Sequence, residues 1–210
     1  RACRRALQAE LGLQASDDAL LLTVVSRLTA QKGLDLLLAA LPALLHAGVQ
    51  VAVQGTGEPA LEAAFQMAML SNPHRVHTYI GYDEARAHRL IAGADVIAVP
   101  SRFEPCGLTQ LYGLRYGTLP IVRRVGGLAD TVADHGDGDD ASTGFVFDDA
   151  SALALERCVL RAMTLRRDAA AWQARMRTAM AQPLSWDGPA REYLSLYRSL
   201  GRAGAAPDAT

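Results

Sequence analysis

The chain has 210 residues, of which half are hydrophobic and a fifth are charged, and its formal net charge is −1. This composition is typical of a globular protein with a sizeable core, in one large domain or two small ones. The near-neutral charge argues against a dedicated nucleic-acid or membrane-surface role, since both usually show a basic excess. No apolar run approaches the roughly 20 residues of a membrane span. Three widely spaced cysteines (Cys3, Cys106 and Cys158) do not make a disulfide framework, so we expect a reducing, cytoplasmic setting.

Short apolar runs alternate with amphipathic helical patterns along the chain. In order they predict helix 4–11, strand 20–25, helix 34–47, strand 49–53, helix 59–70, strand 76–80, helix 84–91, strand 96–99, helix 108–116, strand 119–122, strand 145–147, and helices 152–165, 169–181 and 188–200. This alternation predicts an α/β fold with a doubly wound parallel sheet, Rossmann-like, with helices on both faces. The small-residue segment 201–210 is expected to be a disordered tail.

Polar and glycine residues gather where the predicted strands end. They are Ser26 and Arg27, residues 55–57, Gly81 and Tyr82, residues 101–107, and residues 123–127. Any tight turn favours glycine, so some of these are expected to be ordinary turns. Ligands of doubly wound sheets bind at the carboxyl ends of the strands, however. Five such turns together favour a ligand site at this edge.

The segment 100–110 carries the strongest chemical signal. A helix is expected to begin near Gly107, and the free N–H groups of its first turn, with the helix dipole, would bind an anion such as phosphate. Gly107 would allow close approach of the ligand, and Thr109 would add a hydroxyl donor. Glu104 would face the same cleft and accept hydrogen bonds from a sugar or polyol. The alternative for Glu104 is an acid that complements the helix dipole.

Lys32 is the single lysine among 21 lysine and arginine residues. A lysine in an arginine-rich chain is a candidate for a place where a compact ammonium is needed. Lys32 and Arg27 follow the first strand, where two cations would hold a diphosphate and stabilise the charge that grows when it leaves. The alternative is an ordinary helix start with solvated charges. Tyr82 would offer an aromatic face to a base, or else be a buried core residue.

Residues 26–33, 81–82, 100–117 and 126–128 together resemble bacterial glycogen synthase, the starch synthase type that uses ADP-glucose. The run Ser-Arg-Phe-Glu-Pro-Cys-Gly-Leu-Thr-Gln-Leu-Tyr-Gly-Leu is long and highly specific. The resemblance covers residues 4–200, but only to the carboxyl-terminal half of that family. It implies the C-terminal domain of a glycosyltransferase B architecture, which binds the nucleotide-sugar donor. The acceptor domain, with its Lys-X-Gly-Gly-Leu motif, is expected to be absent from this chain.

The resemblance also implies roles for individual residues. The catalytic residues would be Arg27 and Lys32, which clamp the diphosphate, and Glu104, which lies beside the transferred glucose. The donor-binding residues would be Tyr82, against adenine, and the backbone of Cys106, Gly107, Leu108 and Thr109, around the distal phosphate. The wider superfamily often has a second glutamate eight residues after the first. Tyr112 occupies that position here, so a ribose contact by an acid is not carried over.

The reaction implied is transfer of glucose from ADP-glucose, with retention, to the 4-hydroxyl at the non-reducing end of an α-1,4-glucan. The departing phosphate would accept the acceptor's proton, and no metal or other cofactor is expected. The expected partners are ADP-glucose or ADP and, through the missing domain, the glucan, but neither nucleic acid nor a membrane. This chain alone is expected to bind the donor weakly and to transfer little or no glucose.

Two alternatives remain open at this point: a stand-alone nucleotide-binding module, and a related glycosyltransferase that uses a UDP-sugar. A dehydrogenase is disfavoured because no Gly-X-Gly-X-X-Gly follows the first strand. Cys106 is not expected to be a nucleophile, since no base is adjacent in sequence.

Two further segments have structural interpretations. Residues 134–140 are interpreted as a solvated surface loop rather than a calcium loop. The apolar side of the last helix, with Tyr193, Leu194, Tyr197 and Leu200, is interpreted as core. Because the resemblance implies that this helix crosses to the missing domain, part of its apolar face is expected to be uncovered.

Overall fold

The computed structural model describes residues 2–134 and 142–203, and within them six parallel strands form one sheet. The strand order is β3-β2-β1-β4-β5-β6. The strands are β1 (Leu21–Val25), β2 (Gln50–Gly55), β3 (Val76–Ile80), β4 (Val96–Val99), β5 (Leu119–Arg123) and β6 (Phe145–Phe147). The predicted doubly wound α/β fold is confirmed.

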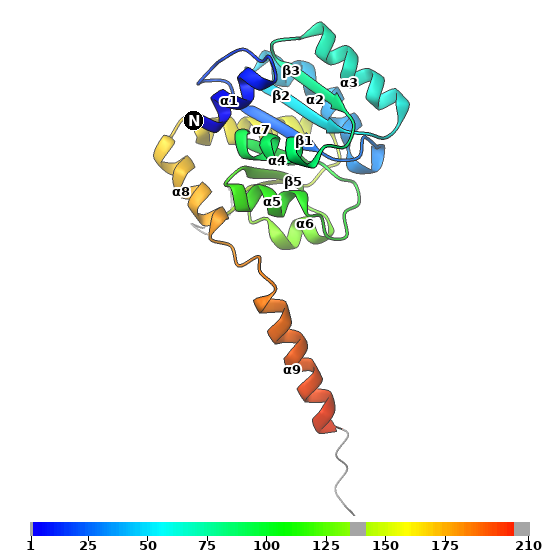
Figure 1. The fold of residues 1–210 in the computed structure, drawn as a ribbon, viewed down its shortest axis with the longest axis vertical. Coiled ribbons are helices and arrows are strands. Elements are labelled where there is room, and N and C mark those ends of the chain that lie inside the picture. The colour runs from blue at the N-terminus through cyan, green and yellow to red at the C-terminus, as the bar shows by residue number, and fades with distance from the viewer. Residues whose placement is uncertain (1, 135–141, 204–210) are drawn as a thin grey trace, which may run out of the picture.

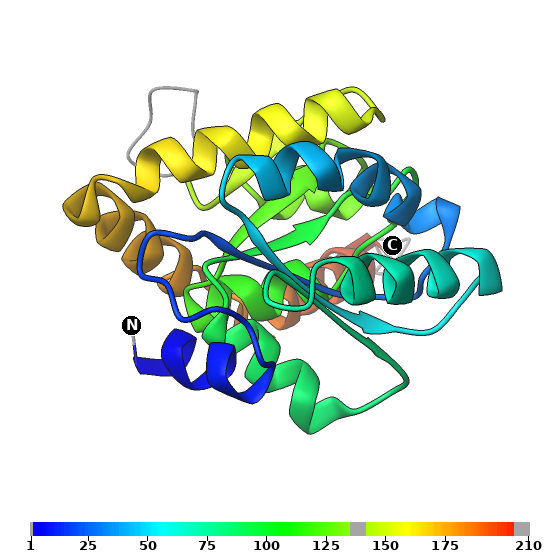
Figure 2. The same cartoon turned by 90° about the horizontal axis from the view of Figure 1, so that it is seen from above.

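Helices cover both faces of the sheet (Figures 1 and 2). The helices are α1 (Ala2–Glu10), α2 (Leu34–His46), α3 (Pro59–Ser71), α4 (Glu84–Gly93), α5 (Thr109–Tyr116), α6 (Gly126–Thr131), α7 (Ala152–Arg166), α8 (Ala169–Met180) and α9 (Asp187–Ala203). Helices α2, α3 and α7 lie on one face, and α1, α4, α5 and α6 lie on the other (Figure 2). Helix α8 packs against α5 and α7.

The strands have nearly continuous apolar sequences because they are buried on both faces of the sheet. In β1, Leu22 and Val24 belong to the main core beneath α2 and α7, whereas Leu21 packs with residues of α1 and α4. Successive side chains of a strand point to opposite faces, so one short segment supplies both cores.

The sequence does not predict two short helices, the 3-10 turn η1 (Ala30–Lys32) and α6. Helix α6 begins at two glycines, Gly126 and Gly127, which the sequence pattern places in a turn. A Cβ on Gly126 would lie 2.1 Å from the carbonyl oxygen of Glu104, and one on Gly127 would lie 2.6 Å from Cα of Cys106. These glycines therefore allow α6 to pack directly against the loop that follows β4.

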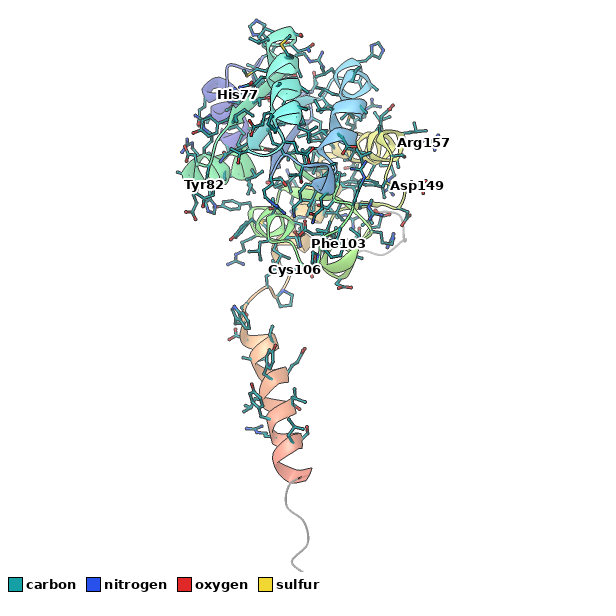
Figure 3. The ribbon with its side chains drawn as sticks, turned by 90° about the vertical axis from the view of Figure 1, so that its right-hand side faces the viewer. His77, Tyr82, Phe103, Cys106, Asp149 and Arg157 are labelled. Carbon is teal, nitrogen blue, oxygen red and sulfur yellow. The ribbon has the colours of Figure 1, made fainter. Side chains whose placement is uncertain are left out.

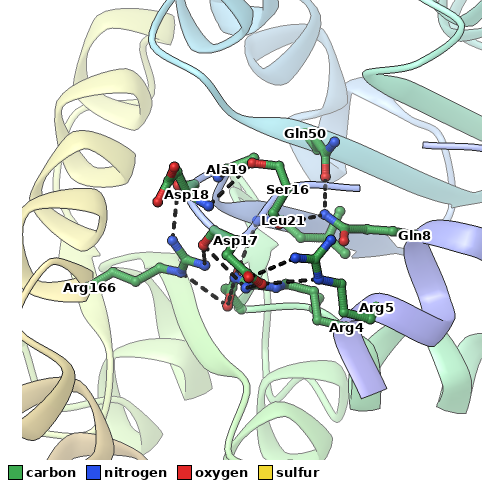
Figure 4. Close-up of polar contacts among 12 residues, drawn as sticks. Arg4, Arg5, Gln8, Ser16, Asp17, Asp18, Ala19, Leu21, Gln50 and Arg166 are labelled. Atoms are coloured by element: carbon green, nitrogen blue, oxygen red, sulfur yellow. Dashed lines mark hydrogen bonds and ion pairs between the residues drawn. The ribbon is translucent and has the colours of Figure 1, made fainter. Parts of the chain in front are cut away.

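An ion-pair network ties α1 and α7 to the amino-terminal edge of the sheet (Figure 4). Asp95, just before β4, accepts a hydrogen bond from the backbone N–H of Leu21 at 2.8 Å. Its carboxylate also pairs with Arg4 at 3.3 Å and Arg166 at 3.2 Å, and Arg4 pairs in addition with Asp17 at 3.1 Å. Burial raises the pKa of Asp95, while the Leu21 N–H and Arg4 lower it. The turns predicted to bind a ligand lie at the opposite, carboxyl-terminal edge of the strands.

Helix α9 stands away from the domain (Figure 1). Its apolar residues Tyr193, Leu194, Tyr197 and Leu200 are all exposed, so their interpretation as core is wrong for this chain and the expected uncovered face is confirmed. The helix continues to Ala203, three residues into the predicted tail, and residues 204–210 lie outside the described part. No helix in the described ranges is long and apolar enough to cross a membrane.

Asp134 opens the segment interpreted as a solvated loop, but its side chain is buried. It accepts a hydrogen bond from the backbone N–H of Val146 at 2.7 Å and pairs with Arg161 at 3.1 Å. The solvated interpretation is therefore wrong for Asp134, and residues 135–141 lie outside the described part.

Replacing Gly33 by alanine is expected to destabilise the fold strongly. Gly33 has φ +71°, and a Cβ there would lie 2.0 Å from the carbonyl oxygen of Pro100. The strain of a left-handed alanine and the overpacking together predict that the free energy of unfolding, measured in urea, falls by roughly 3 kcal/mol. The matched control is Gly12→Ala, since Gly12 has φ +68° but open space around its Cβ position, and we expect a loss of about 1 kcal/mol. Equal losses would contradict the packing argument.

Candidate functional site

The candidate site lies where β1 and β4 run side by side. From β1 the chain proceeds to β2 and β3 on one side, and from β4 it proceeds to β5 and β6 on the other. A crevice forms at such a switch point, outside the carboxyl ends of the strands. It holds a cavity of about 330 Å³. Its lining includes Val25, Ser26, Lys32, Leu34, residues 98–100, Glu104 and residues 107–110.

An ion pair between Lys32 and Glu104 joins the two sides of this crevice. Lys32 ends η1, which Thr29 caps by accepting the Lys32 backbone N–H. The Lys32 ammonium contacts Oε2 of Glu104, which also accepts a hydrogen bond from the Ser101 hydroxyl at 3.1 Å. The two side chains are only 18% and 9% exposed. The alternative of a solvated charge is therefore wrong for Lys32, whereas Arg27 is exposed.

A second ion pair fixes the loop of Glu104 to the loop of Lys32. The Nη1 and Nη2 atoms of Arg102 donate to the two carboxylate oxygens of Asp35, at 2.6 and 2.7 Å. Nη1 also donates to Ala30 O at 2.6 Å. This guanidinium holds the pKa of Asp35 below its usual value. The pair is therefore ionised at neutral pH, and its contribution to stability is lost as the pH falls through the lowered pKa.

Arg123, at the end of β5, holds the beginning of the β4–α5 loop. Its Nε donates to Ser101 O at 2.9 Å, and its Nη2 donates to Arg102 O at 2.6 Å. A third contact, from Nη1 to Asp148 O at 3.3 Å, joins the end of β6. One side chain thus fixes the loop relative to two neighbouring strands.

The remainder of the same loop rests on α6 and leads into α5. The backbone N–H of Gly127 lies 3.2 Å from Glu104 O and 3.1 Å from Pro105 O. Helix α5 begins at Thr109, slightly later than the predicted start near Gly107, and its first N–H groups have no helical carbonyl to bind. This end of α5 therefore offers hydrogen-bond donors and a favourable dipole to an anion.

The structure brings together five of the eight predicted site residues. Those that line the cavity are Lys32, Glu104, Gly107, Leu108 and Thr109. The other three are not among its lining residues. Arg27 is exposed, and Tyr82 is 86% exposed, so its interpretation as a core tyrosine is wrong. Cys106 lies at the surface (Figure 3).

Sequence reasoning missed the residues that support the site. They are Asp35, Ser101, Arg102, Gln110 and Arg123. Three of them, Asp35, Arg102 and Arg123, act through partners that are distant in the sequence. Ser101 and Gln110 also bind groups only three or four positions away, which is a local signal. Among the described residues, no group of three or more His, Cys, Asp and Glu side chains is placed to hold a metal ion.

The three cysteines are expected to differ sharply in reactivity. Burial raises the pKa of Cys158 to about 11, so its thiol is protonated at pH 8, whereas Cys3 and Cys106 are exposed. Ellman's reagent should modify two thiols of the folded chain and the third only after unfolding. Cys106→Ser should remove one fast thiol, and Cys158→Ala should remove none. Fast reaction of all three would contradict the burial of Cys158.

This chain is similar to several known proteins. The family model of the glycosyl transferases group 1 matches residues 12–179. The glycogen synthase of Leptothrix cholodnii is 56% identical over 200 residues, which make up 94% of this chain and 41% of that protein. The glycogen synthase of Edwardsiella ictaluri is 55% identical over 197 residues, with 92% and 41% covered. The chain thus spans about two fifths of the length of these relatives.

Solved structures of glycosyltransferases also match this chain. The catalytic domain of starch synthase IV from Arabidopsis thaliana, bound to ADP and acarbose, matches with a TM-score of 0.84 and 32% identity, over 94% of this chain and 42% of that one. The glycosyltransferase WaaG, at 24% identity and a TM-score of 0.67 over 88% of this chain and 48% of that one, shares the fold. With its parallel sheet, its crevice between β1 and β4 and a family match over most of its length, this chain belongs to the group 1 glycosyl transferases.

Proposed function

We propose that this chain is the donor-binding domain, residues 1–200, of a cytoplasmic glycogen synthase. The whole enzyme would transfer glucose from ADP-glucose, with retention, to the non-reducing end of an α-1,4-glucan. The observation that carries the proposal is that Lys32 and Glu104 meet in a cavity beside the N-terminus of α5. A cation and free N–H groups suit phosphates, and a carboxylate suits sugar hydroxyls. Identities of 54–56% to glycogen synthases support the choice of enzyme.

Donor binding would rearrange the Lys32–Glu104 pair. The ammonium of Lys32 would turn to a phosphate oxygen. Arg27, which is exposed and follows Ser26 of the cavity lining, would bind the diphosphate as well. The carboxylate of Glu104 would keep its hydrogen bond from Ser101 and accept others from glucose hydroxyls. The exposed ring of Tyr82 would stack on adenine.

The distal phosphate would lie against the start of α5. The backbone N–H groups of residues 106–109 and the hydroxyl of Thr109 would bind it there. Every one of these donors is brought by the β4–α5 loop or by the first turn that follows it.

The chemistry requires charge stabilisation and placement of the acceptor. The bond between the anomeric carbon and the phosphate oxygen breaks, and its electron pair leaves with ADP. Lys32, Arg27 and the N–H groups of α5 stabilise the new charge. The acceptor's 4-hydroxyl attacks from the same face and gives its proton to the departing phosphate oxygen. This scheme requires neither a protein base nor a metal ion.

The acceptor glucan would bind to the part of the longer relatives that this chain does not span. We propose that the same part covers the apolar side of α9, where Tyr193, Tyr197 and Leu200 are exposed. The chain alone would therefore bind donor and transfer little or no glucose. A stand-alone nucleotide-binding module is less well supported, because the glycogen synthases matched are more than twice as long.

ADP is favoured over UDP as the nucleotide. The relatives at 54–56% identity are glycogen synthases, and the starch synthase IV structure holds ADP. Two solved structures that hold UDP, from Anabaena HepE and S. aureus TarM, share 20% and 14% identity with this chain and support the fold alone.

Replacing Lys32 by glutamine should weaken ADP binding by about tenfold or more, because a charge-assisted hydrogen bond to phosphate is lost. Calorimetry at fixed ionic strength measures the affinity for ADP, and UDP is titrated in parallel. EDTA is added to test the scheme in which no metal ion is required. The control is Arg115→Gln, which removes an exposed cation from the last turn of α5. Tighter binding of UDP than of ADP would refute the donor assignment, and binding of neither would refute the proposal.

Replacing Glu104 by glutamine should separate its role from that of Lys32. The amide keeps the size of the side chain but releases Lys32 from its ion pair, so the affinity for ADP should not fall. The additional affinity for ADP-glucose over ADP should fall, because a carboxylate that accepts sugar hydroxyls is lost. If Glu104→Gln weakened ADP itself as strongly as Lys32→Gln does, Glu104 would not be the sugar ligand.

A further inference from the structure

Gln110 has an unusual set of contacts for a residue in the first turn of a helix. Its side chain is completely buried. Nε2 lies 3.0 Å from Cys106 O, 2.9 Å from Gly107 O and 3.2 Å from the hydroxyl oxygen of Thr131. The reverse orientation of the amide would place Oε1 against three oxygen atoms. The contacts therefore fix the amide with its N–H groups toward the loop.

These contacts determine where the loop's own N–H groups point. A trans peptide is planar, so its N–H points opposite to its carbonyl. Because Cys106 O and Gly107 O both turn toward Gln110, the N–H groups of Gly107 and Leu108 point away from it. Gly107 and Leu108 both line the cavity. Gly107 adopts φ +76°, a left-handed conformation in which a side chain would be strained.

Gln110 also joins this turn to the support of Glu104. The hydroxyl of Thr131, which Gln110 binds, donates to Gly127 O at 2.6 Å. The backbone N–H of Gly127 in turn lies 3.2 Å from Glu104 O. A chain of hydrogen bonds therefore runs from the amide of Gln110 through α6 to the residue that pairs with Lys32.

We propose that Gln110 is a positioning residue for the donor's distal phosphate, which it orients through the N–H groups of Gly107 and Leu108. This inference rests on the proposed function. Gln110 is among the residues that line the cavity, but its side chain carries no charge, is completely buried and directs Nε2 at carbonyl groups, so we infer that it acts through the backbone that it holds. Its loss should therefore reduce the contribution of the phosphates to binding and leave the contribution of the nucleoside unchanged.

The test compares ADP with adenosine, both measured by ligand-observed NMR on the whole chain. Gln110→Met keeps the length of the side chain and removes the donor. We expect the ratio of ADP affinity to adenosine affinity to fall by about tenfold, the effect of one misaligned charge-assisted hydrogen bond. Adenosine affinity should stay within about twofold. Gln110→Glu, which places oxygen against the same carbonyls, should lower the ratio at least as far.

A matched control is available just after the end of α8. Gln182 Nε2 donates to Thr178 O at 3.1 Å, the same four-residue spacing as Gln110 to Cys106, but Gln182 is absent from the lining of the cavity. Gln182→Met should leave the ratio unchanged, and melting temperatures of all variants report their folding.

Three results would overturn the inference. One is an unchanged ratio in folded Gln110→Met. Another is an equal loss of ADP and adenosine affinity, which would show a general structural role. The third is an unsubstituted chain with no preference for ADP over adenosine, which would refute the proposed function together with the inference.

Discussion

The site depends on the orientation of the peptide groups in the β4–α5 loop. Their carbonyl oxygens are bound by Arg123, by the backbone of Gly127 and by Gln110. Buried backbone groups need partners, and a trans peptide directs its N–H opposite to its carbonyl. Once the carbonyl groups are bound on one side, the N–H groups before α5 are the donors that remain for a ligand. The sheet order then places β1 beside β4, so that Lys32 meets Glu104.

The sheet and the edge that carries the site could be predicted from the sequence because both depend on local patterns. Continuous apolar runs such as β1 are required of strands that are buried on both faces. Lys32 and Glu104 follow strands that are neighbours in the sheet, so their meeting follows from topology. Helix α6 could not be predicted in this way, since its two glycines serve a contact with a loop that is distant in the sequence.

Three supporting residues, Asp35, Arg102 and Arg123, could not be predicted because their roles depend on distant partners. Arg102 and Asp35 are 67 positions apart, and Arg123 and Ser101 are 22 apart. Asp134 lies in an acidic, glycine-rich stretch that suggests solvent exposure, yet Arg161 and the end of β6 bind it. Helix α9 shows the opposite case, since its apolar pattern suggests a core that is not found among the described residues.

The buried pair of Lys32 and Glu104 has a consequence for selectivity. Before a donor enters, the ammonium is already neutralised by a carboxylate that is only 9% exposed. A free phosphate ion that took Lys32 would leave this buried carboxylate with the Ser101 hydroxyl but without its counter-charge, which is unfavourable. In the proposed function, a sugar nucleotide would bring hydroxyl groups to Glu104 together with its phosphates and would meet both needs at once. On the proposed function, the pair filters out simple anions in favour of a ligand that carries sugar and diphosphate together.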